Sequence, residues 1–120
     1  MTTQRGSAVV EFALVLPLVL LAIVAVVEVA VIARTQLEVV NAAREGAREA
    51  ATSPDPARAV RAARGALGPS GSEARVSVKR PDVVGGTAEV VVRVRHVVAS
   101  ALFGGHVVEL SGRAAMRVER

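Results

Sequence analysis

A single carboxylate, Glu11, stands near the start of a long apolar run and is the first residue whose type and position could do chemistry. No charged residue follows it until Glu28, so the stretch between the two glutamates gives roughly 24 Å of uncharged helix at about 1.5 Å per residue. A carboxylate at mid-depth in a membrane costs at least about 2.5 kcal/mol, less near the interface, and such residues usually have a partner. Glu11 therefore needs a cationic partner.

No basic side chain lies within one helical turn of Glu11. The nearest cationic group would be a new amino terminus, created if the chain were cut after Gly6. That terminus could pair with Glu11 of the same subunit or of the next subunit in an assembly. The sequence thus suggests processing combined with self-assembly.

The two histidines, His96 and His106, flank the connection 97–105 and could approach each other across a hairpin. Two histidines without a third ligand make a weak metal site, and the chain has no cysteine to supply one. The sequence also contains no P-loop, no glycine-rich dinucleotide motif and no serine elbow. We predict no catalytic residue, no metal and no cofactor, and expect the chain to be the substrate of an enzyme rather than an enzyme.

The apolar run is long enough to cross a bilayer. Residues 7–27 reach roughly 31 Å as a helix, close to the hydrocarbon thickness of about 30 Å, and this length places Glu11 near one edge of the membrane. A secretory signal peptide cleaved near Ala33 is a minor alternative, because the run is longer than such segments and contains a glutamate. The net charge is +4, but the arginines are spread out rather than clustered with aromatic residues. We therefore predict a solvated surface rather than a nucleic-acid site.

Gly6 and Ser7, with Glu11 followed by Phe12, resemble the type IV prepilin signature. The run VEFALVLPLVLL, the second glutamate Glu28 and the later AAREGAR resemble the TadE-like pseudopilins of tight-adherence (Flp-type) pilus systems. This resemblance covers roughly the first 51 residues.

The resemblance implies that a prepilin peptidase cuts after Gly6, which makes Glu11 the fifth residue of the mature chain. It implies assembly through Glu11, Phe12, Pro17 and Glu28. Pro17 removes a helix hydrogen bond, so a kink or loosened turn is expected near 13–17, which in pilins lets the helix stretch in the fibre; simple tolerance of proline in a membrane helix is an equal alternative. The expected partners are the peptidase, other pilin or pseudopilin subunits, the assembly platform and the lipid bilayer. The expected location is the bacterial inner membrane, single-pass, with a cytoplasmic N-terminus and an extracytoplasmic C-terminal domain.

The function implied is that of a minor pilin or pseudopilin contributing to a tight-adherence pilus. The alternative is an uncleaved, membrane-anchored protein whose exterior domain binds a partner. The expected domains are a leader at 1–6, a transmembrane and assembly helix at 7–33, and an extracytoplasmic helix with a small α+β domain at 34–120.

Beyond the membrane span the helix is predicted to continue, with Arg34 and Glu38 paired one turn apart. Small residues spaced by four give it a smooth flank to which another backbone can come close. Its members are Ala42, Gly46 and Ala50, with Ala43, Ala47 and Ala51 beside them. A wider apolar stripe, which includes Leu37 and Val40, predicts the buried face.

The prolines at 54 and 56 should end this helix, and a short second helix is predicted at 57–67, followed by a loop at 68–72. Alternating apolar and polar residues then predict three strands, around 75–79, 88–95 and 108–119. The predicted fold class is α+β: a long N-terminal helix, half transmembrane and half exposed and amphipathic, a short second helix, and a small three-stranded antiparallel sheet packed on the long helix. Leu102 and Phe103 are expected to cap the core.

Overall fold

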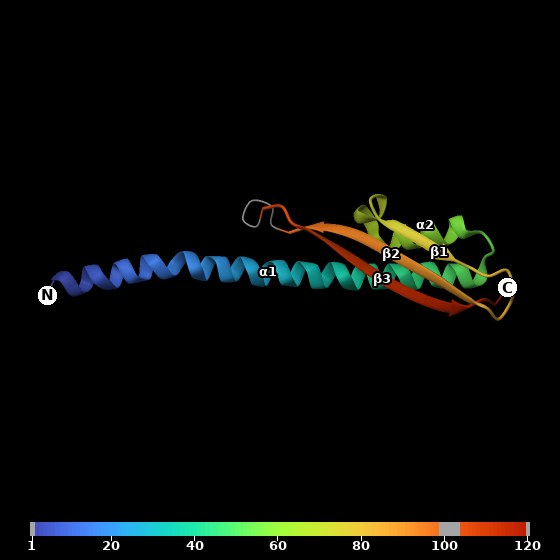
Figure 1. Ribbon diagram of the computed structural model, residues 1–120, viewed down its shortest axis with the longest axis horizontal. Helices are drawn as coiled ribbons and strands as arrows, with labels where there is room; N and C mark the ends of the chain where they lie inside the picture. Colours follow the sequence, from blue (N-terminus) through green and yellow to red (C-terminus); the bar gives the residue numbers. More distant parts are fainter. Residues whose placement is uncertain (1, 99–103, 120) are drawn as a thin grey trace. The chain divides into compact units, whose positions relative to one another are not determined.

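A computed structural model describes residues 2–98 and 104–119 of the chain. Helix α1 (Thr2–Thr52) is followed by helix α2 (Pro56–Leu67), a short 3-10 helix η1 (Gly68–Ser72) and the strands β1 (Arg75–Lys79), β2 (Thr87–Val97) and β3 (Val107–Arg117) (Figure 1). The predicted α+β fold is therefore confirmed. The chain forms two compact units, Met1–Val31 and Ile32–Arg120, and α1 contributes residues to both.

Helix α1 continues through Pro17 without a break and ends at Thr52, where the sequence predicts its end. The following prolines disfavour helical geometry in the residues before them. Asp55 then starts α2 as its N-cap, accepting a hydrogen bond from the Ala57 N–H at 3.0 Å, and Pro56 occupies the first turn, where no amide hydrogen is needed. One short segment thus ends one helix and begins the next.

The segment 68–72, predicted as a loop, instead forms the 3-10 turn η1. Gly71 makes this turn possible, because a Cβ built there would lie 2.2 Å from the Arg64 carbonyl oxygen of the preceding helix. The glycine lets the chain fold back against the end of α2, and 3-10 turns are common at such helix ends.

The three strands form one antiparallel sheet in the order β1-β2-β3. Val78 lies opposite Val90, and Val92 lies opposite Gly112, so the register places the inward residues of neighbouring strands in line. Along β2, every second residue from Ala88 to Val94 is buried, as the alternation of the sequence predicts.

The core of the second unit lies between this inner face and the smooth flank of α1. Every member of the flank is buried, which confirms the predicted packing. A Cβ built on Gly46 would lie 3.0 Å from Cγ1 of Val90 and 3.1 Å from Cβ of Ala63. The predicted stripe begins at Val29 and was wrong over its first part, because Val29, Ala33 and Leu37 are all exposed. Val39, which is not in the stripe, is fully buried. The proposed core cap, Leu102 and Phe103, lies outside the described residues.

The last turn of α1 is tied to two other segments. The Arg80 Nε, beyond β1, donates to the Ala50 carbonyl oxygen at 2.8 Å, and the Glu119 N–H, beyond β3, donates to the Ala51 carbonyl oxygen at 2.9 Å. Carbonyl groups at a helix end have no partner within the helix, so these bonds satisfy groups that would otherwise need water or a cap.

Gly112 provides a test of this packing. A Cβ there would lie 2.8 Å from the Val39 carbonyl oxygen and 2.9 Å from Cα of Val40, both backbone atoms of α1. We expect Gly112→Ala to destabilise the second unit by about 1–3 kcal/mol, because neither backbone can yield cheaply. Amide hydrogen exchange of β2, measured on the full chain, reports the free energy needed to open the second unit, and this free energy should fall in the variant.

The matched control is Gly65→Ala in α2, where a Cβ meets nothing within 4 Å. That substitution should leave the stability of the second unit unchanged or raise it by up to about 1 kcal/mol, since alanine favours helix formation more than glycine does. Equal exchange rates in the two variants would contradict the described contact.

Candidate functional site

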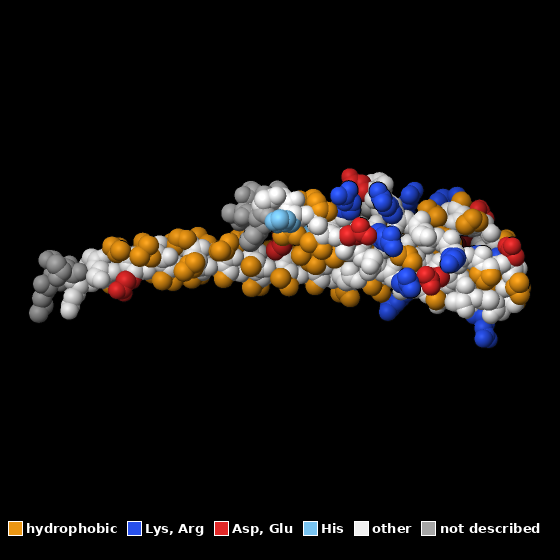
Figure 2. Space-filling model, in the orientation of Figure 1, with side chains coloured by type: hydrophobic (Ala, Val, Ile, Leu, Met, Phe, Trp, Pro, Cys, Tyr) orange, Lys and Arg blue, Asp and Glu red, His pale blue; other side chains and the backbone are white. Residues whose placement is uncertain are grey.

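The N-terminal part of α1 exposes apolar side chains in every direction. Phe12, Leu14 and Leu18 are each about two thirds exposed, and every residue at 4–23 is exposed in this structure. Figure 2 shows hydrophobic side chains following one another along this segment. A helix that is apolar all round is stable only in an apolar environment, and α1 is long and apolar enough to cross a membrane.

Glu11 lies in this apolar surface. Its side chain is exposed and makes no hydrogen bond or ion pair with any residue that the structure describes. Ser7 precedes it by one helical turn on the same face, and the Cα–Cβ bonds of a helix tilt toward its N-terminus. The Cα–Cβ bond of Glu11 therefore points toward the turn that contains Ser7.

Gly6 has open surroundings. A Cβ added to it would meet no atom within 4 Å, so packing among the described residues does not require a glycine there. Glycine inside a helix costs about 1 kcal/mol relative to alanine. Neither the helix nor its contacts therefore account for Gly6.

The remaining predicted assembly residues lie at different places along α1. Phe12 is 68% exposed beside Glu11, Pro17 lies within the unbroken helix, and Glu28 is half-buried. Farther along, the Nε of Arg34 lies 3.2 Å from Oε1 of Glu38, which confirms the predicted pair. Both of these side chains are largely exposed to solvent, and such pairs add little stability.

The two histidines lie on opposite sides of the β2–β3 hairpin, close to its connection. His96 lies opposite Val108 in the ladder, and the carbonyl oxygen of His106 accepts from the Val98 N–H at 2.9 Å. The described residues contain no group of three or more histidine, cysteine or acidic side chains that could hold a metal ion.

A cluster of arginines on the outer face of the sheet was not predicted from the sequence. Arg75 on β1 and Arg93 on β2 are direct partners in the ladder, with Arg95 on the same face. Basic and apolar residues alternate in both strands, which indicates that the arginines of each strand share one face. Only the register between the strands shows that arginines of different strands are neighbours, and a single sequence does not give that register.

An apolar helix with fully exposed sides, joined to a small helix-and-sheet unit, defines a class of membrane-associated proteins with a domain outside the apolar segment. The family model described as TadE-like protein matches residues 6–48. The predicted resemblance is thereby confirmed: this segment is TadE-like. The search of curated proteins and the search of solved structures found no match.

The matched segment begins at Gly6, includes Glu11 and Glu28, and ends within the smooth flank of α1. The match likens this segment, and not the whole chain, to TadE-like proteins, which are generally non-enzymatic. Helix α2 and the three strands lie outside the match.

Membrane association has a direct test in the middle of the apolar segment. Arginine at the centre of a membrane helix costs roughly 2.5–3.5 kcal/mol, so Leu20→Arg together with Ile23→Arg should offset much of the favourable insertion free energy. We expect a large part of the doubly substituted protein to leave the membrane pellet on alkaline extraction.

The control carries the same added charge elsewhere. Leu37→Arg with Val83→Arg changes two exposed apolar residues of the second unit and should leave the protein in the pellet. Full retention of both double variants would argue against a membrane-crossing role for this segment.

Proposed function

We propose that this protein is a minor pilin of a tight-adherence pilus system, trimmed after Gly6 by a prepilin peptidase and assembled through its apolar helix. Before assembly it lies in the inner membrane with a cytoplasmic N-terminus and an extracytoplasmic second unit. The observation that carries the proposal is Glu11, an exposed carboxylate in an apolar surface, without a partner among the described residues and one turn after Ser7.

The carboxylate of Glu11 needs a cation in either apolar environment available to the helix. In a bilayer an unpaired charge is costly, and in a fibre of packed helices water is likewise excluded. Cleavage after Gly6 leaves an ammonium group on Ser7, which supplies that cation. The pair forms within one subunit or between neighbouring subunits, and in the second case it sets the register of one helix against the next.

The surroundings of Gly6 support processing independently. Neither the helix nor its contacts require a glycine at this position. Recognition by a peptidase would explain it, because the active site of the peptidase must come close to the bond that it cuts and a glycine leaves room for that approach. The TadE-like match, which begins at this residue, is consistent with that role.

The mature N-terminus is the first measurement to make, by intact mass of protein recovered from its native membrane. We expect a chain that begins at Ser7, and we expect Gly6→Val to leave the chain uncut because the added side chain occupies the space the peptidase needs. Ser7→Ala is the control and should still be cut. A wild-type chain that begins at Met1 or Thr2 with the peptidase present would favour the uncleaved, membrane-anchored alternative.

The role of Glu11 is tested separately from cleavage. Glu11→Gln keeps the shape of the side chain but removes its charge, so insertion and processing should persist while the amount of assembled pilus falls sharply. The measurement compares protein in sheared pilus fractions with protein in membranes. Glu38→Gln, which removes a partly exposed glutamate of the second unit, should assemble normally. Normal assembly of Glu11→Gln would refute the proposed registration.

A further inference from the structure

The outer face of the sheet, opposite the buried valines, is strongly basic. Its exposed basic residues outnumber its two glutamates, Glu89 and Glu109. We call this surface the arginine face, made by Arg75, Lys79, Arg93, Arg95, Arg113 and Arg117.

The arginine face places like charges directly beside one another. Arg75 is the ladder partner of Arg93, and like charges directly opposite each other in an antiparallel pair are destabilising. Arg95 follows Arg93 on the same face, diagonal to Arg75, at a spacing of roughly 7–8 Å. The sheet therefore holds three guanidinium groups close together at some cost in stability.

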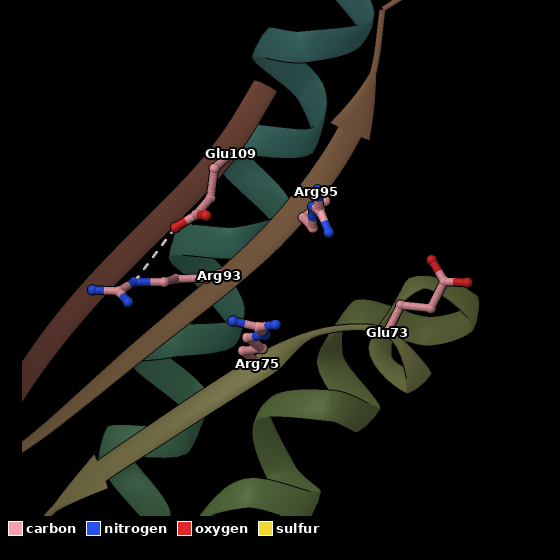
Figure 3. Close-up of a pocket in the computed structure, with 5 residues that line it drawn as sticks. All are labelled: Glu73, Arg75, Arg93, Arg95 and Glu109. Atoms are coloured by element: carbon pink, nitrogen blue, oxygen red, sulfur yellow. Dashed lines mark ion pairs between the residues drawn. The ribbon is translucent and has the colours of Figure 1, made fainter. Parts of the chain in front are cut away.

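Glu109, which is the ladder partner of Arg95, and Glu89 form ion pairs with two other arginines of the face. The Nε of Arg93 lies 3.7 Å from Oε1 of Glu109, and the Nε of Arg113 lies 3.5 Å from Oε1 of Glu89. Neither Arg75 nor Arg95 makes a side-chain hydrogen bond or ion pair with any described residue. Figure 3 shows this arrangement, with Arg93 joined to Glu109 and with Arg75 and Arg95 beside it.

These side chains line a recess. Its volume is about 130 Å³, and its walls are the three arginines with Glu73 and Glu109. A recess of this size takes small groups such as carboxylates rather than a bulky ligand, and a guanidinium group binds a carboxylate through two parallel hydrogen bonds.

We propose that this recess, rather than the whole arginine face, binds an extended acidic segment of a protein partner, with two carboxylates received by Arg75 and Arg95. Alternate residues of an extended chain point to the same side at a spacing of roughly 6.6 Å, close to the diagonal between the two arginines. Acidic residues separated by one residue therefore match this pair. The inference goes beyond the proposed pilin function and does not depend on cleavage or on Glu11.

The glutamates in the recess favour a polypeptide over a uniform polyanion. Duplex DNA carries a charge every 1.7 Å or so along its axis and would bring phosphates against Glu73 and Glu109. A peptide places carboxylates only where the arginines are and can offer N–H donors to the glutamates. The chain also contains no tryptophan or tyrosine on which the bases of a single strand could stack.

The test uses the full chain in detergent and a labelled peptide in which threonine and glutamate alternate, with binding followed by fluorescence anisotropy at low salt. We expect saturable binding that weakens as salt is added, and at least roughly ten-fold weaker binding for Arg75→Gln with Arg95→Gln, since two charge-assisted contacts are lost. A peptide of alternating threonine and glutamine should not bind.

Arg113→Gln is the matched control, because it removes one charge from the same face at an arginine already paired with Glu89. It should change the affinity less than two-fold or so, as expected for screened charges at a distance. Amide exchange of β2 verifies that each variant keeps the sheet. The proposal is overturned by absence of peptide binding, by an equal loss in the control, or by tighter binding of a duplex DNA of similar length with the same dependence on Arg75 and Arg95.

Discussion

The second unit depends on the close approach of two backbones, that of α1 and that of the sheet. Gly46 and Gly112 lie at this contact, where an added Cβ would press on Val90 or on the helix backbone at Val39. Among the described residues, the largest fully buried side chains are valines. A core built mainly of alanine, glycine and valine, with few leucines, buries little apolar area per residue, so its stability comes from tight fit rather than from large side chains.

The same constraint explains what the sequence could predict. Small residues spaced by four, from Ala42 to Ala51, and the strict alternation along β2 predict both partners of the contact because packing geometry imposes those periods. The end of α1 at the proline pair and the start of α2 at Asp55 and Pro56 can also be predicted, because each depends only on residues close in the sequence. Glu11, Gly6 and Ser7 were recognisable as candidates because a charge and a glycine stand out near or within an apolar run.

Other features depend on how the elements pack against one another, which cannot be predicted from one sequence. Leu37 and Val39 differ by two positions on the helix, and the placement of the sheet decides which of them is buried. The turn η1 has loop-like composition, and its helical form follows from the contact of Gly71 with α2. The pairing of Arg75 with Arg93 depends on register, which is fixed by the whole ladder rather than by either strand alone.

The bonds that Arg80 and Glu119 make to the last turn of α1 have a mechanical consequence. A helix end that is free in water unravels one residue at a time, because each step breaks little. Here two carbonyls of the last turn accept hydrogen bonds from residues that lie just beyond strands β1 and β3, so unwinding the last turn requires breaking those bonds as well. Tension carried along α1 is therefore shared between helix and sheet at the point where an isolated helix would yield first.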